Sequence, residues 1–146
     1  MTAFWLLKSE PDVFSWNDLV SRGPKGEAWD GVRNYQARNN MRAMKVGDLG
    51  FFYHSNEGKE IVGILRVISP AHPEAKDDTG KWECVDVAAV KPVPKPVGLD
   101  AVKANPKLSA MVLVNNSRLS VQPVSAEEWK EICKMGGVDL KTLKGS

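Results

Sequence analysis

The sequence has no long apolar run and few cysteines, and each shortage excludes a class of protein. No apolar run approaches the roughly 20 residues that a transmembrane helix needs. The N-terminus lacks the basic start and the small-residue cleavage site of a secretory signal peptide, so we expect an intracellular protein, which would be cytoplasmic in a bacterium. Cys84 and Cys133 stand far apart and form no CxxC pair, which predicts reduced core thiols and no disulfide.

The common signatures of enzymes and metal sites are missing as well. There is no GxSxG elbow, no phosphate loop, no GxGxxG after a strand and no HExxH. No second histidine or cysteine stands at metal-ligand spacing from His54, so we expect neither a metal nor a cofactor. A Ser–His–Asp set can be assembled from scattered residues, but any chain of this size allows that. The sequence therefore favours a binding protein over an enzyme.

The overall composition is that of a soluble globular protein. The 146 residues, 42% hydrophobic and 26% charged, fit one domain with a real core. The net charge is only +2, but its distribution is uneven. Residues 31–47 and 101–126 contain lysine and arginine but no aspartate or glutamate, whereas acidic residues are concentrated in residues 57–86. The two basic stretches either form one surface for nucleic acid or are ordinary solvated faces, and the sequence does not choose between these.

Hydrophobic periodicity and capping residues predict the order of the elements. Ser15, Asn34 and Ser125 are the expected N-caps of three helices. We expect helices over residues 16–21, 35–44 and 126–135, strands over 4–7, 49–53, 61–68, 82–90, 111–114 and 118–124, and an edge or loop at 92–96. Because the central strands follow one another without intervening helices, this order predicts an α+β fold with a mostly antiparallel sheet that is compatible with a barrel. The expected core residues are Trp5, Leu7, Phe51, Val62, Ile64, Val67, Val87, Leu119, Val121 and Trp129, and the last residues should be loose.

Four segments carry the side chains that could bind a ligand. The first, Lys8-Ser9-Glu10, places an amine, a hydroxyl and a carboxylate at a strand end, where function tends to lie. The second runs from Trp29 to Asn40 and combines stacking faces, amides and guanidinium groups, which a pocket for a nucleobase needs. Its candidates are Trp29, Asp30, Arg33, Asn34, Tyr35 and Arg38. The alternatives are a polar turn for the first segment, and a buried tryptophan with a capped helix for the second.

The other two segments are a polar-aromatic strand end and a strand face. Their candidates are Tyr53, His54, Ser55 and Asn56, followed by Arg118, Ser120 and Gln122. A lone histidine such as His54 is more often a structural hydrogen-bonding group than a ligand, and the strand face can simply be exposed. We expect all four segments, 8–10, 29–34, 53–56 and 117–122, to converge on one cleft.

Several long motifs in order give this chain a specific resemblance. WLLKSEPD, WDGVRNYQARNNMRAMKVGD, FFYHSN, IVGILRVI and NNSRLSVQPV together resemble the EVE domain, over nearly the whole chain. The resemblance implies a PUA-like β-barrel flanked by short helices, similar also to the YTH domain, which reads a methylated adenine. It implies a single domain and, as partner, nucleic acid carrying a modified base. We expect no membrane partner, and a monomer is favoured.

Two alternatives to a modified-base reader remain open. The ASCH domains, another PUA-like family, include amidohydrolases that act on acylated cytidine with lysine and glutamate at the pocket. Lys8 and Glu10 supply the same residue types here, and a buried Lys8 beside Glu10 would favour that function. The other alternative is a small-molecule sensor that uses the same pocket.

Overall fold

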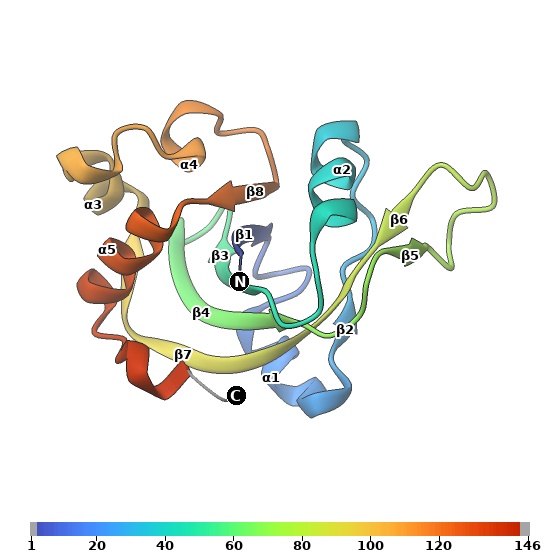
Figure 1. Ribbon diagram of the computed structural model, residues 1–146, viewed down its shortest axis with the longest axis horizontal. Coiled ribbons are helices and arrows are strands. Elements are labelled where there is room, and N and C mark those ends of the chain that lie inside the picture. Colours follow the sequence, from blue (N-terminus) through green and yellow to red (C-terminus); the bar gives the residue numbers. More distant parts are fainter. Residues whose placement is uncertain (1–2, 144–146) are drawn as a thin grey trace.

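A six-stranded sheet that curls into a half-barrel forms the centre of the protein (Figure 1). The computed structural model describes residues 3–143. The strands are β1 (Phe4–Ser9), β2 (Glu27–Ala28), β3 (Leu49–His54), β4 (Glu60–Val67), β5 (His72–Pro73), β6 (Glu83–Cys84), β7 (Asp86–Gly98) and β8 (Val121–Val124). Their order in the large sheet is β2-β7-β4-β3-β1-β8, and β5 with β6 forms a separate two-stranded ribbon. β1 and β3 run parallel and the other pairs are antiparallel, so the expected mostly antiparallel α+β fold is confirmed.

Short helices cover both faces of this sheet, and three of them begin at the residues that the sequence indicates. The α-helices are α1 (Trp16–Arg22), α2 (Tyr35–Ala43), α3 (Leu99–Ala104), α4 (Val112–Asn115) and α5 (Ala126–Gly136), and the 3-10 helices are η1 (Gly23–Lys25), η2 (Pro106–Leu108) and η3 (Leu140–Leu143). Ser15 and Ser125 each form a capping box with the residue three positions later, and the Asn34 side chain accepts a hydrogen bond from the Ala37 N–H. These caps satisfy N–H groups that have no partner inside the helix.

Each face of the sheet has its own hydrophobic cluster. On one face, α5 packs Trp129 between the rings of Phe4 and Phe51, at centroid distances of 4.5 and 4.0 Å. On the other face, Trp16 of α1 and Met41 of α2 belong to a cluster that includes Phe52 of β3 and Leu65 of β4. The predicted core is confirmed except for Val62, which is only partly buried and lies at a register irregularity between β4 and β7.

The structure corrects two predictions at the level of single elements. The apolar run Met111–Val114 is not a strand, because Met111 is the N-cap of α4 and the next three residues begin that helix. A short apolar run has the same pattern in a buried helix as in a buried strand. Residues 140–143 form η3 and Leu143 is buried, so the expectation of a loose tail is wrong for these residues; residues 144–146 lie outside the described part. The proline-rich residues 92–96 are confirmed as an edge, because β2 pairs with β7 only at Asp86 and Val87.

Candidate functional site

Two neighbouring pockets lie at the ends of β1 and β3. Because these strands are parallel and in register, Lys8 lies beside Tyr53 and Ser9 beside His54. The larger pocket, the tryptophan pocket, has a volume of about 540 Å³. It is lined by Lys8, Ser9, Val13, Phe14, Arg22, Glu27, Ala28, Trp29, Asp30, Gly31, Val32, Arg33, Lys76 and Ser120. The smaller one, the lysine pocket, has a volume of about 210 Å³. It is lined by Lys8, Tyr53, Ser55, Asn56, Lys59, Leu99, Leu113 and Ser117.

All four predicted segments therefore border this region, with Lys8 on both pockets. They do not form the single cleft that the sequence led us to expect. Residues 8–9, 29–33 and Ser120 line the tryptophan pocket, whereas Tyr53, residues 55–56 and Ser117 line the lysine pocket. The division follows from strand alternation, which directs neighbouring side chains of β1 to opposite faces of the sheet.

Trp29 and Phe14 form the aromatic part of the tryptophan pocket. Trp29 follows β2, and its backbone N–H donates to the carbonyl of Val85 at 2.8 Å. Its ring meets Phe52 edge-on at 5.5 Å and Phe14 at 6.3 Å, and only 7% of the residue is exposed. The indole N–H makes no hydrogen bond to a described residue. Trp29 is thus a core residue and a pocket residue at once.

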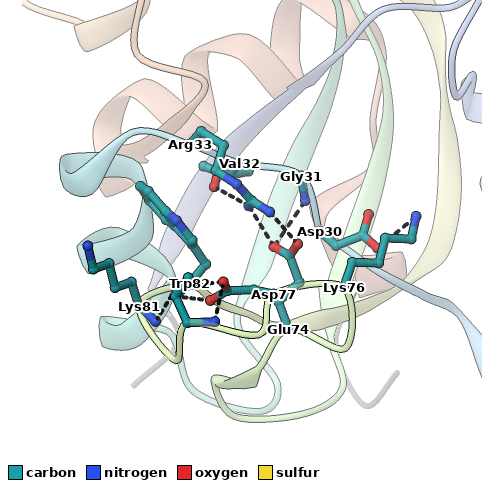
Figure 2. A network of polar contacts seen from close by, with 10 residues as sticks. Asp30, Gly31, Val32, Arg33, Glu74, Lys76, Asp77, Lys81 and Trp82 are labelled. Carbon is teal, nitrogen blue, oxygen red and sulfur yellow. Dashed lines mark hydrogen bonds and ion pairs between the residues drawn. The ribbon is translucent and has the colours of Figure 1, made fainter.

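A bidentate ion pair fixes the loop that follows Trp29 (Figure 2). Two guanidinium nitrogens of Arg33 donate to the two carboxylate oxygens of Glu74, at 3.0 and 2.8 Å, and the Gly31 N–H donates to the same carboxylate at 3.1 Å. The guanidinium holds the pKa of Glu74 below its ordinary value, and the carboxylate raises the pKa of Arg33. With 2% of its side chain exposed, Glu74 depends on these donors to remain ionised.

Other charges at the tryptophan pocket are paired too. Arg22 contacts Glu27 at 3.0 Å and Lys76 contacts Asp30 at 3.5 Å. Among the described residues, Lys8 is the only cation of the pocket wall without a carboxylate partner. The wall therefore offers polar groups with little net charge, which suits an uncharged polar ligand better than an anion.

Tyr35 and Arg38, two predicted site residues, contact the hairpin formed by β5, β6 and the turn between them, and they line neither pocket. In Figure 1 the β5–β6 ribbon projects beside α2. Tyr35 stacks on Trp82 with ring centroids 5.0 Å apart, and Arg38 lies over Tyr35 and donates to the carbonyl of Lys81. Asp77 holds the turn by accepting hydrogen bonds from Thr79 and Trp82, and those bonds with Thr79 lower its pKa to about 2.

Lys8 is half-buried and turns toward the lysine pocket. Its ammonium group donates to the carbonyl oxygen of Ser117 at 2.6 Å and lies 5.7 Å from the centre of the Tyr53 ring. Burial lowers its pKa. Glu10 is exposed and lines neither pocket, so the lysine–glutamate pair that the amidohydrolase alternative needs is not formed.

Four further predicted site residues line neither pocket, and three of them have structural contacts. His54 accepts a hydrogen bond from the Trp16 N–H at 3.0 Å, which caps α1 and requires a neutral imidazole; burial lowers its pKa accordingly. Asn34 caps α2. The Gln122 amide donates to the Leu119 carbonyl at 2.7 Å, and its own buried oxygen has no partner among the described residues. Arg118 is exposed.

Sequence reasoning missed the acids that neutralise the basic stretch. Arg33 pairs with Glu74 and Arg42 with Glu83, both from the acid-rich middle of the chain. It also missed Phe14, Lys76 and Lys59 as pocket residues. Long-range pairing of isolated charges leaves no local pattern, so only the separation of acidic and basic stretches along the chain pointed to it.

Comparisons of the sequence and of the structure with known proteins lead to the same family. The family model for the EVE domain matches residues 3–135. Thymocyte nuclear protein 1 of Mus musculus is 35% identical over 167 residues, which cover 92% of this chain and 74% of that protein.

Two solved structures with clear sequence identity are close matches. Protein Atu2648 from Agrobacterium tumefaciens, 57% identical, superposes with a TM-score of 0.90 and covers 94% of both chains. Human THYN1, solved in complex with DNA containing 5-methylcytosine, is 34% identical with a TM-score of 0.86, over 94% of this chain and 99% of that one. The YTH domain of Zygosaccharomyces rouxii MRB1 shares the fold, with a TM-score of 0.57 at 17% identity. The expected PUA-like fold with flanking short helices is thereby confirmed.

Proposed function

Because this chain belongs to the EVE domain family, we propose that it binds nucleic acid and holds one modified base in the tryptophan pocket. The observation that carries the proposal is the meeting of residues 8–9 with residues 29–33 around that pocket, in a chain 34% identical to a protein solved with methylated DNA. A volume of about 540 Å³ suits a small ligand such as a single base. The base would have to leave the stack of its own strand to enter.

The chemistry of the wall fits a base better than it fits a charged group. Trp29 and Phe14 offer aromatic surface for stacking, which tolerates any base. In the proposed complex the indole N–H of Trp29, which makes no hydrogen bond to a described residue, donates to the base. The Ser9 hydroxyl donates its hydrogen to the Phe14 carbonyl at 2.6 Å, which leaves its oxygen lone pairs free to accept. The fixed charge pairs around the pocket keep these groups in place without attracting a phosphate into it.

A binding comparison with matched variants tests the proposal. The probes are single-stranded and duplex DNA with one 5-methylcytosine, and the same strands with unmodified cytosine. Trp29→Phe removes the indole donor but keeps an aromatic ring, so it should reduce affinity for the methylated strand by roughly 5- to 10-fold, as expected for one lost hydrogen bond. Trp129→Phe is the control, because it alters a buried tryptophan on the opposite face of the sheet.

The outcomes separate the competing functions. If wild-type protein binds both strands equally, the modified-base assignment is wrong. If Trp129→Phe reduces affinity as much as Trp29→Phe, the effect is one of stability and the tryptophan pocket is not the site. A free nucleoside that binds as tightly as the oligonucleotide favours a small-molecule sensor. Incubation with N4-acetylcytidine, followed by chromatography for cytidine and acetate, tests the amidohydrolase alternative.

A further inference from the structure

The lysine pocket has a lining that the recognition of a base does not use. Two ammonium groups, those of Lys8 and Lys59, border it together with two serines, Asn56 and the hydroxyl-bearing ring of Tyr53. No carboxylate belongs to the lining, and neither lysine has a carboxylate partner among the described residues. The tryptophan pocket shows the opposite arrangement, because its other cations are paired. The lysine pocket therefore concentrates unneutralised positive charge next to hydroxyl and amide groups.

The backbone keeps these groups in position. Asn56 and Lys59 both adopt positive φ, 69° and 47°, in the turn between β3 and β4. The Lys59 carbonyl accepts a hydrogen bond from the Leu99 N–H at 2.8 Å, which ties this turn to the start of α3. A lysine at positive φ is uncommon, and the tertiary contact holds it there. Tyr53, 3% exposed, belongs to the hydrophobic core and also lines the pocket.

We propose that the lysine pocket binds a phosphate group. Its volume of about 210 Å³ is below the range of pockets that enclose a whole small ligand, so it fits a single group. Lys8 is half-buried with no counter-ion, and an anion would supply the missing charge. Ammonium, hydroxyl and amide donors are the groups that bind phosphate.

The source of the phosphate follows from Lys8, which borders both pockets. The phosphate belongs to the nucleotide whose base occupies the tryptophan pocket, so this step rests on the proposed function, whereas the affinity for phosphate itself does not. Phosphate contacts position a nucleic acid and base contacts specify it. The two pockets would divide these tasks between them.

A substitution at Asp100 should change phosphate affinity in the opposite direction to a substitution at Lys59. Asp100 lies in the first turn of α3, next to Leu99. Burial is the larger cause of the raised pKa of Tyr53, and the charge of Asp100 adds to it. This negative charge opposes a phosphate in the pocket. Asp100→Asn should therefore strengthen phosphate binding, whereas Lys59→Gln should weaken it. Lys95→Gln, which removes an exposed lysine of β7 that lines neither pocket, is the matched control.

The first experiment titrates the wild-type protein with inorganic phosphate and follows backbone amide resonances. We expect saturable shifts centred on Ser55, Asn56, Lys59 and Ser117. Lys59→Gln should weaken this binding by about threefold to tenfold, Asp100→Asn should strengthen it, and Lys95→Gln should leave it unchanged. Shifts that are absent, or that lie elsewhere, overturn the proposal. So does an equal loss in Lys59→Gln and Lys95→Gln, because it shows general charge attraction only.

The second experiment compares 5-methyl-2′-deoxycytidine with its 5′- and 3′-monophosphates by calorimetry. One monophosphate should bind about tenfold more tightly than the nucleoside, and Lys59→Gln should remove most of that gain without changing affinity for the nucleoside. If the nucleoside does not bind while inorganic phosphate still does, the proposed function fails and the phosphate site stands. If both monophosphates bind no better than the nucleoside, the link between the pockets is wrong.

Discussion

The two pockets share Lys8 and lie at the ends of the same strands, but most charged side chains are paired at one pocket and unpaired at the other. At the tryptophan pocket Arg33 meets Glu74, and Lys76 meets Asp30 (Figure 2). At the lysine pocket, Lys8 and Lys59 have no such partner among the described residues. Paired charged side chains hold the pocket wall in place, whereas an unpaired ammonium group can still bind an anion. The difference shows which pocket is built for a neutral group and which for an anion.

The contrast has a thermodynamic consequence. A buried carboxylate with three N–H donors contributes to stability, because removal of any partner leaves an unsatisfied group. A half-buried ammonium without a counter-ion does the reverse, since burial disfavours its charged form. Substitutions in the two pockets should therefore change the free energy of unfolding with opposite sign.

The largest expected effect is the loss of the Glu74 carboxylate. Glu74→Gln keeps the shape but removes the charge that accepts from Arg33 and Gly31, so the free energy of unfolding should fall by about 2 kcal/mol. Affinity for the methylated strand should fall as well, because the loop after Trp29 loses its anchor. Urea denaturation and the DNA-binding assay measure the two effects.

Glu83→Gln is the control for that experiment. Glu83 pairs with Arg42, but the pair is more exposed than the Glu74 pair and lies outside both pockets. The expected change in stability is below about 1 kcal/mol, as for other exposed ion pairs. Equal losses in Glu74→Gln and Glu83→Gln would contradict a special role for the tryptophan pocket.

The next effect is smaller and of the opposite sign. Lys8→Met keeps the apolar stem of Lys8 and removes its uncompensated charge, while the cation–π contact with Tyr53 and the bond to Ser117 are lost. Because the surroundings lower the pKa of Lys8, the free energy of unfolding should be unchanged or higher, by less than about 1 kcal/mol. Inorganic phosphate binding should weaken markedly. A loss of stability greater than about 1 kcal/mol would show that Lys8 is a structural residue.

The pH dependence of the free energy of unfolding also tests whether the charge of Lys8 is uncompensated in the folded protein. Since the pKa of Lys8 is lower in the folded protein than in the unfolded chain, the unfolded chain binds more protons and stability due to this group rises with pH up to about 10.4. Lys8→Met should flatten the alkaline part of the stability curve. Saturating phosphate should flatten it too, because a bound anion restores the pKa of Lys8.

The fold was predictable because its local signals agree with its tertiary contacts. Ser15, Asn34 and Ser125 cap helices as their side chains indicate, and Val121 of β8 is buried as predicted. The α4 helix was missed because four apolar residues carry no usable period. Its position between η2 and β8 depends on long-range packing that a local pattern does not record.

The candidate site was predictable only in part, for a similar reason. Polar residues at strand ends located the region, and Lys8, Ser9 and Trp29 do line a pocket. His54 and Gln122 share the same polar character but face helix α1 and the Leu119 carbonyl. Strand alternation shows that neighbouring side chains face opposite ways, but which face is hollow depends on the helices that cover it. Glu74 was missed because one acid among many has no distinguishing neighbourhood in the sequence.

The smallest expected effect concerns the hairpin that carries Glu74 to the pocket. His72, in β5, donates to Asp86 of β7 at 2.9 Å when protonated, and this bond raises its pKa. The His72 pair is half-exposed on both sides, so it should contribute no more than about 0.5 kcal/mol. Because the folded pKa lies above the unfolded value of about 6.5, this contribution is complete below pH 6.5 and is lost as the pH rises through the folded pKa.

The contribution of His54 to stability depends on pH in the opposite direction, so the effect of His72 has to be isolated with a His72→Gln variant. The pKa of His54 is lowered, so the stability linked to it rises with pH toward 6.5 and partly cancels the effect of His72 in the wild-type protein. Subtracting the curve of His72→Gln from that of wild type, between pH 5 and 8.5, removes the share due to His54. The difference should favour wild type at acid pH, vanish at alkaline pH and shrink in 1 M salt, where exposed charges are screened. A difference that persists at pH 8.5 would show that the neutral imidazole also stabilises the hairpin, by packing or by a hydrogen bond to Asp86.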